Sequence, residues 1–172
     1  MALPESAEPL AVFIGAPGAG KTRLGKRVAK RLGVPFVDTD KTIVAEHGPI
    51  PAIFEAHGEP YFREIERQHV SSALASRSIV ALGGGAVLHP DTQRDLANLR
   101  VIQVTVSPEA VAARIDNAKR PLLAQGVEAW VALVAARQPI YDALATRSWD
   151  TSRLPIDGIA ADISQWIESE TA

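Results

Sequence analysis

A glycine-rich segment near the N-terminus carries the clearest chemistry in the sequence. Residues 15–22 read GAPGAGKT and match the GxxxxGK(S/T) pattern without a gap. In this pattern the backbone N–H groups curl toward phosphate oxygens, the lysine reaches the β- and γ-phosphates, and the threonine hydroxyl ligates Mg²⁺. An apolar run before it and an amphipathic helical pattern after it distinguish such a phosphate loop from a chance glycine-rich turn. The predicted nucleotide-binding residues are Gly15, Ala16, Pro17, Gly18, Ala19, Gly20, Lys21 and Thr22.

Two acidic residues, Asp38 and Asp40, end the second apolar run. Side chains two positions apart in an extended chain share a face, so both carboxylates are expected to look into one cleft. One of them is suited to Mg²⁺ and the other to an acceptor hydroxyl. Paired acids at a strand end are also common as helix N-caps. The two residues alone leave both interpretations open.

The elements that position these residues alternate along the chain. Apolar runs predict strands at 10–14, 35–38, 79–82, 101–106 and 148–150. Helical patterns lie between them, namely one that ends at Gly33, most of 39–76 with breaks near 48–49 and 57–58, one that starts at Ser107 and Pro108, one over 128–145, and a closing helix from Ile156. This alternation predicts an α/β fold with a parallel sheet and helices on both faces, with ligands at the carboxyl ends of the strands. Residues 116–125 are predicted to be a mobile loop.

Composition restricts the function further. The 172 residues fit one domain, with residues 1–9 as a loose N-terminal arm. The net charge of −2 gives no basic footprint for nucleic acid, and no cysteine is present to form a disulfide or a thiolate site. No signal peptide or membrane-spanning run is predicted, and the interpretation is a soluble, cytoplasmic, monomeric protein.

The phosphate loop alone is shared by motors, GTPases and kinases. A GTPase would be expected to carry an NKxD motif, which the sequence lacks, and a motor ATPase usually needs a larger domain. A small-molecule or nucleotide kinase remains.

Further motifs make the sequence similar to one family, the shikimate kinases. After the phosphate loop come DTD at 38–40, GEPYFREIE at 58–66, LGGGAV at 82–87, RPLL at 120–123 and RQPIY at 137–141. The resemblance runs from about Leu10 to the C-terminal helix. It implies a three-layer sandwich whose five-stranded parallel sheet has strand order 2-3-1-4-5. It also implies transfer of the ATP γ-phosphoryl group to the 3-hydroxyl of shikimate.

The resemblance implies roles on the acceptor side, in a substrate-binding subdomain at about 39–76 and in the loops near it. Asp40 would bind the shikimate hydroxyls and orient the 3-hydroxyl, Arg63 and Arg137 would hold the carboxylate, and Gly84 would offer backbone contact. Each role is physically reasonable, because guanidinium forks match planar carboxylates and glycine allows close approach of the backbone. Without the family, Arg63 and Arg137 would be read as surface ion-pair partners on helices.

On the nucleotide side, Lys21 and Arg120 would form the electrostatic centre, with Arg120 on a lid at about 116–125 that closes over the phosphates. Thr22 and Asp38 would hold Mg²⁺, and Arg153 would lie at the adenine pocket. The four histidines are not predicted to be metal ligands.

Two departures from the family pattern concern local geometry. The segment 48–54 is one residue shorter than usual and carries an extra proline, and the lid is only loosely similar outside RPLL. Two rival functions are weighed. One is a gluconate or nucleoside monophosphate kinase on the same scaffold. The other is a non-catalytic nucleotide-binding module, which would be expected to have lost Lys21, Thr22, Asp40 or Arg120.

Overall fold

A computed structural model describes residues 7–115, 126–153 and 155–171 of the chain. Five strands form one sheet in the order β2-β3-β1-β4-β5, and every neighbouring pair is parallel. The predicted α/β class, strand order and parallel direction are therefore confirmed. The strands are β1 (Ala11–Gly15), β2 (Phe36–Asp38), β3 (Ile79–Ala81), β4 (Val101–Thr105) and β5 (Arg147–Asp150).

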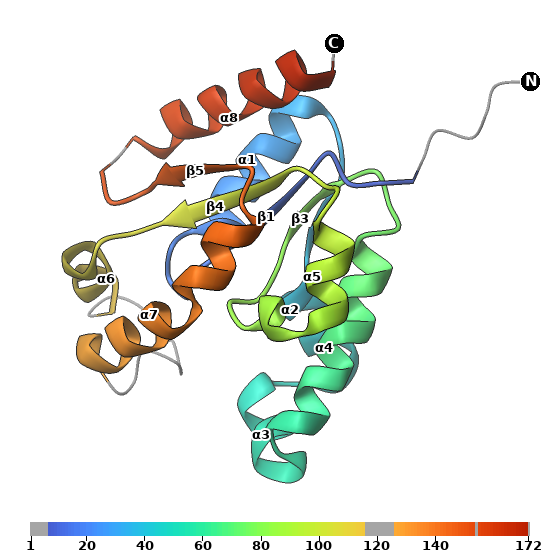
Figure 1. The fold of residues 1–172 in the computed structure, drawn as a ribbon, viewed down its shortest axis with the longest axis vertical. Coiled ribbons are helices and arrows are strands. Elements are labelled where there is room, and N and C mark those ends of the chain that lie inside the picture. Colours follow the sequence, from blue (N-terminus) through green and yellow to red (C-terminus); the bar gives the residue numbers. More distant parts are fainter. Residues whose placement is uncertain (1–6, 116–125, 154, 172) are drawn as a thin grey trace, which may run out of the picture.

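Helices cover both faces of the sheet, as Figure 1 shows. Helices α1 and α8 pack together on one face, and α4, α5 and α7 lie on the other. The helices are α1 (Lys21–Leu32), α2 (Thr39–His47), α3 (Ile50–His57), α4 (Glu59–Ala73), α5 (Pro90–Leu96), α6 (Pro108–Ile115), α7 (Val127–Leu144) and α8 (Ile156–Thr171), with a 3₁₀ turn η1 at Ala86–Leu88.

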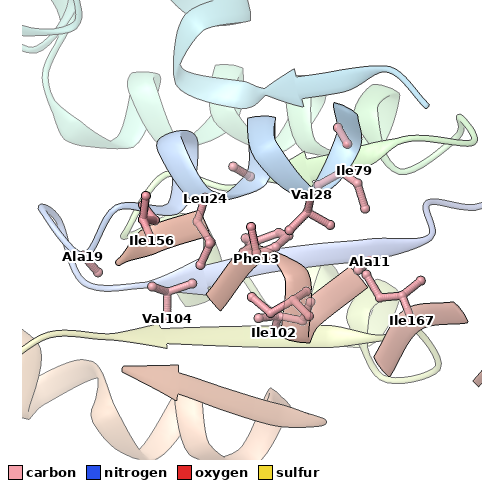
Figure 2. Packing of buried hydrophobic residues seen from close by; sticks show 14 residues of the cluster. Ala11, Phe13, Ala19, Leu24, Val28, Ile79, Ile102, Val104, Ile156 and Ile167 are labelled. Carbon is pink, nitrogen blue, oxygen red and sulfur yellow. The ribbon is translucent and has the colours of Figure 1, made fainter. Parts of the chain in front are cut away.

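The alternation of β1 divides the core into two layers. Ala11 and Phe13 face α1 and α8, whereas Val12 and Ile14 face α4 and α7. Figure 2 shows the first layer, in which Phe13 lies beneath Leu24 and Val28 of α1. Five apolar residues at helical spacing form a stripe on α8 that contributes to this layer, either buried or packed against it (Ile156, Ile159, Ile163, Trp166 and Ile167). The rigid two-sided core fixes the strand ends that carry the site.

Helices α2, α3 and α4 form a separate packet around a small core of their own. This core consists of Ile43, Ile53, Phe62 and Ile65. The predicted breaks fall at Gly48 and Gly58, the residues at which α2 and α3 end. Their φ values of +86° and +82° cannot continue a right-handed helix and are easily adopted by glycine. The additional proline of the shortened segment, Pro51, lies in the first turn of α3, where proline costs no hydrogen bond. In Figure 1 this packet extends away from the sheet, with α3 at its tip.

Sequence reasoning missed α5 and shifted several element ends by a residue or two. Helix α5 begins with His89 as its N-cap and Pro90 in its first turn, but it buries only Thr92 and Leu96. The two positions have helical spacing, but only Leu96 is apolar, so the sequence shows no apolar periodicity to detect. Ser107, by contrast, accepts from the N–H of Ala110 as the predicted N-cap of α6 (3.2 Å). Within the described residues, no helix is long and apolar enough to cross a membrane.

Candidate active site

The phosphate loop connects β1 to α1 at the carboxyl edge of the sheet. Gly20 adopts a left-handed conformation (φ 95°, ψ 24°), so α1 begins directly at Lys21. The Lys21 ammonium donates to the carbonyls of Gly15 (2.6 Å) and Ala16 (3.0 Å). It is therefore held over the loop whose N–H groups and helix N-terminus suit phosphate. The segment lies between a strand and a helix as the motif requires, and phosphate binding by its residues stays a prediction.

Asp38 makes two contacts, of which the first confirms the N-cap interpretation and the second places its carboxylate beside the phosphate loop. It is the N-cap of α2, where its Oδ1 accepts from the N–H of Lys41 (3.1 Å). Its other oxygen, Oδ2, accepts from the Thr22 hydroxyl. The carboxylate and the hydroxyl thus meet at one point beside the phosphate loop. Two hard oxygen donors fit the preference of Mg²⁺.

Asp40 faces the same cleft, but it lies on a helix and not on the extended strand end that was predicted. The strand ends at Asp38, and Asp40 lies in the first turn of α2, so the expected extended spacing of the two acids is wrong. Both still line an open pocket of about 400 Å³, together with Lys41, Val44 and Ala45. Burial raises the pKa of the Asp40 carboxyl, and the charge of Asp38 raises it further. Lys21 and Arg63 act in the opposite direction.

The glycine loop after β3 brings the acceptor-side residues together. A Cβ atom on Gly83 would lie 2.5 Å from Oδ1 of Asp40, and one on Gly85 would lie 2.5 to 2.7 Å from the Arg63 guanidinium. A Cβ on Gly84 would meet Pro17 of the phosphate loop at 3.1 Å and Nη1 of Arg137 at 3.3 Å. None of the three glycines has a positive φ. Glycine is therefore required here for closeness of side chains and not for backbone conformation.

Arg63 is an ion-pair member whose guanidinium lies against the glycine loop. Its Nη1 donates to Glu66 at 2.8 Å, and its Nη2 contacts the exposed Glu59 at 3.3 Å. The Glu66 side chain is only 4% exposed, and burial raises the pKa of its carboxyl while Arg63 opposes that rise. A buried acid one turn from Arg63 fixes the guanidinium against Gly85. Glu66 belongs to the quoted motif, but the sequence assigned it no role.

Arg137 lies buried on α7 with an unsatisfied donor. Its Nη1 has no hydrogen-bond partner among the described residues, although the residue is only 8% exposed. A buried charged donor without a partner is costly, so an anion bound at this point would stabilise it. One turn further along α7, the Tyr141 hydroxyl donates to the Gly84 carbonyl (2.7 Å). Tyr141 is thus a core residue, as expected, and it also holds the glycine loop.

Three residues near the nucleotide end were missed by sequence reasoning. Arg114 of α6 donates to the carbonyls of Gly18 and Thr151, both at 2.7 Å. The Trp130 indole donates to the Pro17 carbonyl (2.7 Å), and Thr151 donates to that of Ala19 (2.5 Å). These contacts anchor the phosphate loop to α6, α7 and the segment after β5. Each is a single polar side chain contacting a distant carbonyl, and no local pattern reveals it.

Two predicted site residues are not tested by this geometry. Arg120 and the predicted lid at 116–125 lie outside the described residues. Arg153 is exposed after β5, and its contact with nucleotide stays a prediction.

The phosphate loop lies on a parallel sheet of strand order 2-3-1-4-5 and faces a cleft with an aspartate and two arginines. This combination defines a P-loop kinase that acts on a small molecule. The sequence model of the shikimate kinase family matches residues 17–168. A curated shikimate kinase from Thermobifida fusca (strain YX) is 46% identical over 151 residues, which cover 86% of this chain and 88% of the relative. The chain belongs to the shikimate kinase family.

Solved structures agree with this assignment. The shikimate kinase from Acinetobacter baumannii, determined in complex with shikimate, superposes with a TM-score of 0.85 at 30% identity, covering 96% of both chains. A gluconokinase from Sinorhizobium meliloti 1021 covers 94% of this chain and 97% of its own, with a TM-score of 0.59 and 18% identity. The gluconokinase shares the fold only.

Proposed function

We propose that this chain transfers the γ-phosphoryl group of ATP to the 3-hydroxyl of shikimate, giving shikimate 3-phosphate and ADP for aromatic amino-acid (chorismate) biosynthesis. One observation carries the proposal beyond family membership. Asp40, Arg63 and Arg137 all contact the glycine loop at residues 83–85, and Pro17 of the phosphate loop contacts the same glycines. The acceptor groups and the donor loop therefore share one cleft.

The two arginines account for recognition of a carboxylate. Arg137 offers a buried Nη1 with no partner among the described residues, and Arg63 is fixed beside it by Glu66. Guanidinium groups bind carboxylates through parallel, charge-assisted hydrogen bonds. We infer that an incoming carboxylate contacts both guanidinium groups and satisfies the unpaired Nη1 of Arg137.

Asp40 receives the acceptor hydroxyl. Its raised pKa makes it a better proton acceptor than an ordinary exposed aspartate, while Lys21 and Arg63 favour its ionised form. Phosphoryl transfer passes through a loose transition state, so positioning of the hydroxyl contributes more than base strength does. We infer that Asp40 orients the 3-hydroxyl and takes its proton late in the transfer.

The transferring group is met by Lys21, by the N–H groups of the phosphate loop and, in our proposal, by Arg120 of a closing lid. Thr22 and Asp38 would hold Mg²⁺, whose chemistry there is to neutralise phosphate charge. Closure of the lid would exclude water and suppress hydrolysis of ATP. We further propose that residues 39–76 act as a substrate-binding subdomain of one kinase domain, and that the protein acts as a cytoplasmic monomer without nucleic-acid or membrane partners.

A coupled ADP-release assay with separate acceptors tests the function. Shikimate, quinate, gluconate and CMP are supplied at equal concentration with ATP and Mg²⁺, and we expect turnover with shikimate at least tenfold above the others. Faster turnover with gluconate or CMP would favour the rival kinases. Absence of ADP release with all four, from a folded protein that binds ATP, would favour the non-catalytic nucleotide-binding module.

A further inference from the structure

Three potential metal ligands lie together between α2 and α4, outside the residues assigned to ATP and shikimate. Glu46 and His47 end α2, and His69 lies on α4. The Glu46 carboxylate lies 3.5 Å from Nε2 of His47 through Oε1 and 3.3 Å from Nε2 of His69 through Oε2. One ligand atom from each residue can be chosen such that all three lie within 4.8 Å of one another. The three side chains therefore form one cluster that links two helices.

A hydrogen bond on the far side of the His69 ring decides which of its nitrogens faces the cluster with a lone pair. The Thr42 hydroxyl lies 2.9 Å from the Thr39 carbonyl and 2.9 Å from Nδ1 of His69. A carbonyl only accepts, so the single hydroxyl proton is donated to Thr39. Thr42 must then accept from Nδ1–H, which leaves Nε2 of a neutral His69 without a proton. That lone pair points at a carboxylate oxygen 3.3 Å away.

Two facing acceptors require a positive species between them, and the spacing suits a metal. In a tetrahedral zinc site with bonds of 2.0–2.1 Å, neighbouring ligand atoms are separated by about 3.3–3.4 Å. The Glu46–histidine separations of 3.3 and 3.5 Å lie close to this value, but each is measured to a different oxygen of the carboxylate. With one ligand atom per residue the three atoms lie within 4.8 Å of one another, so the exposed Glu46 side chain must shift slightly for one oxygen to serve the same ion as both histidines. A set of two imidazoles and one carboxylate favours Zn²⁺ over Mg²⁺ or Ca²⁺, which prefer oxygen. The Thr42–His69 hydrogen bond is the outer-shell contact that orients metal-bound histidines.

We propose that Glu46, His47 and His69 bind a zinc-class divalent cation that joins α2 to α4, with water completing the coordination. The Glu46 side chain is 66% exposed, compared with 29% for His47 and 12% for His69. The cluster is therefore open to solvent on the Glu46 side, and an ion can enter there. Helix α2 carries Asp40 and α4 carries Arg63, both of which lie against the glycine loop. A bound cation would therefore stiffen the packet that presents the acceptor site.

The proposal is tested by isothermal titration of the nucleotide-free full chain with ZnCl₂. Excess Mg²⁺ is present to occupy the oxygen ligands near Thr22. We expect one Zn²⁺ per chain, and a Tm rise of about 5–10 °C at a hundredfold excess over Kd. His47→Gln and Glu46→Gln should weaken the binding at least tenfold. Thr42→Val, which removes only the outer-shell acceptor, should weaken it about 10- to 100-fold.

His57→Gln is the matched control, because His57 also ends a helix of this packet but stacks on Tyr61 (4.2 Å between ring centroids) and lies outside the cluster. It should leave zinc binding unchanged. Three results would overturn the proposal: no saturable zinc binding, binding that survives both His47→Gln and Glu46→Gln, or equal loss in His57→Gln. The first would mean that a proton, and not a metal, occupies the space between His69 and Glu46.

Discussion

A methyl group on Gly85 is the sharpest available probe of the acceptor site. In Gly85→Ala the new Cβ would lie 2.5 to 2.7 Å from three atoms of the Arg63 guanidinium, whereas ordinary contacts begin at 3.4 Å. The guanidinium must therefore retreat by about 0.7–0.9 Å, a distance that exceeds the ~0.5 Å range of N–H···O hydrogen-bond lengths. Arg63 then loses its alignment with a bound carboxylate.

The expected cost is larger for shikimate binding than for stability, although the displaced guanidinium also pairs with the buried Glu66. Loss of a charge-assisted bidentate contact is worth about 2–3 kcal/mol, so shikimate affinity should fall roughly a hundredfold. The atoms that move are the far end of a flexible side chain, so Tm should fall by only a few degrees. ATP affinity should change less than twofold, because the phosphate loop keeps its own contacts.

Isothermal titration measures the affinities for shikimate and for a non-hydrolysable ATP analogue, and a thermal melt measures Tm. Gly158→Ala is the control, since a Cβ there would meet nothing closer than Pro155 Cγ at 3.8 Å. Wild-type shikimate affinity in a folded Gly85→Ala protein would refute the placement of Arg63 at the carboxylate.

Four further substitutions test the other parts of the site. Lys21→Ala and Arg120→Ala should each lower kcat by on the order of a hundredfold or more, about 3 kcal/mol, with little change in shikimate KM; near-normal turnover of Arg120→Ala in steady-state assays would contradict the lid assignment. Arg137→Lys should weaken shikimate binding by titration and leave ATP binding unchanged, because an ammonium cannot present two parallel donors; unchanged shikimate affinity would contradict the carboxylate contact. Asp40→Asn should abolish turnover and yet raise Tm at neutral pH. The Tm should rise because the folded-state pKa of Asp40 is raised, so the wild type loses the stability linked to the protonated carboxyl as pH rises through that pKa. The Tm difference between this variant and the wild type should grow as pH rises from the ordinary pKa of aspartate through the raised pKa, and then stay constant. A difference that is already constant from acidic pH upward in a series of melts would contradict the raised pKa.

The order of strands and helices was predictable because it depends on local patterns. Buried runs such as residues 79–82 and the stripe on α8 repeat with the periods of strand and helix, and Gly33, Gly48 and Gly58 mark helix ends. Helix α5 escaped prediction because it contributes so little to the core. Local signals, in short, specify elements only where burial is periodic.

The site was predictable only in part, for a different reason. The phosphate loop is one contiguous segment, so its sequence describes its geometry. The meeting of Asp40, Arg63 and Arg137 at one glycine loop is a tertiary contact between four separate segments, and only the family resemblance pointed to it. Arg114, Trp130 and the pairing of His69 with Glu46 belong to no such motif, and the histidines looked scattered along the chain.

The acceptor site is held together at a cost to the fold that substrate binding relieves. Burial raises the pKa values of both Asp40 and Glu66, which means that their ionised forms are disfavoured in the unliganded protein. Arg137 meanwhile keeps a buried donor without a partner among the described residues. A carboxylate placed against Arg137 satisfies that donor, and a hydroxyl that donates to Asp40 stabilises its charge. The unfavourable features at Asp40 and Arg137 thus each have a counterpart in one acid-bearing, hydroxyl-bearing acceptor, and a neutral sugar would satisfy only the one at Asp40.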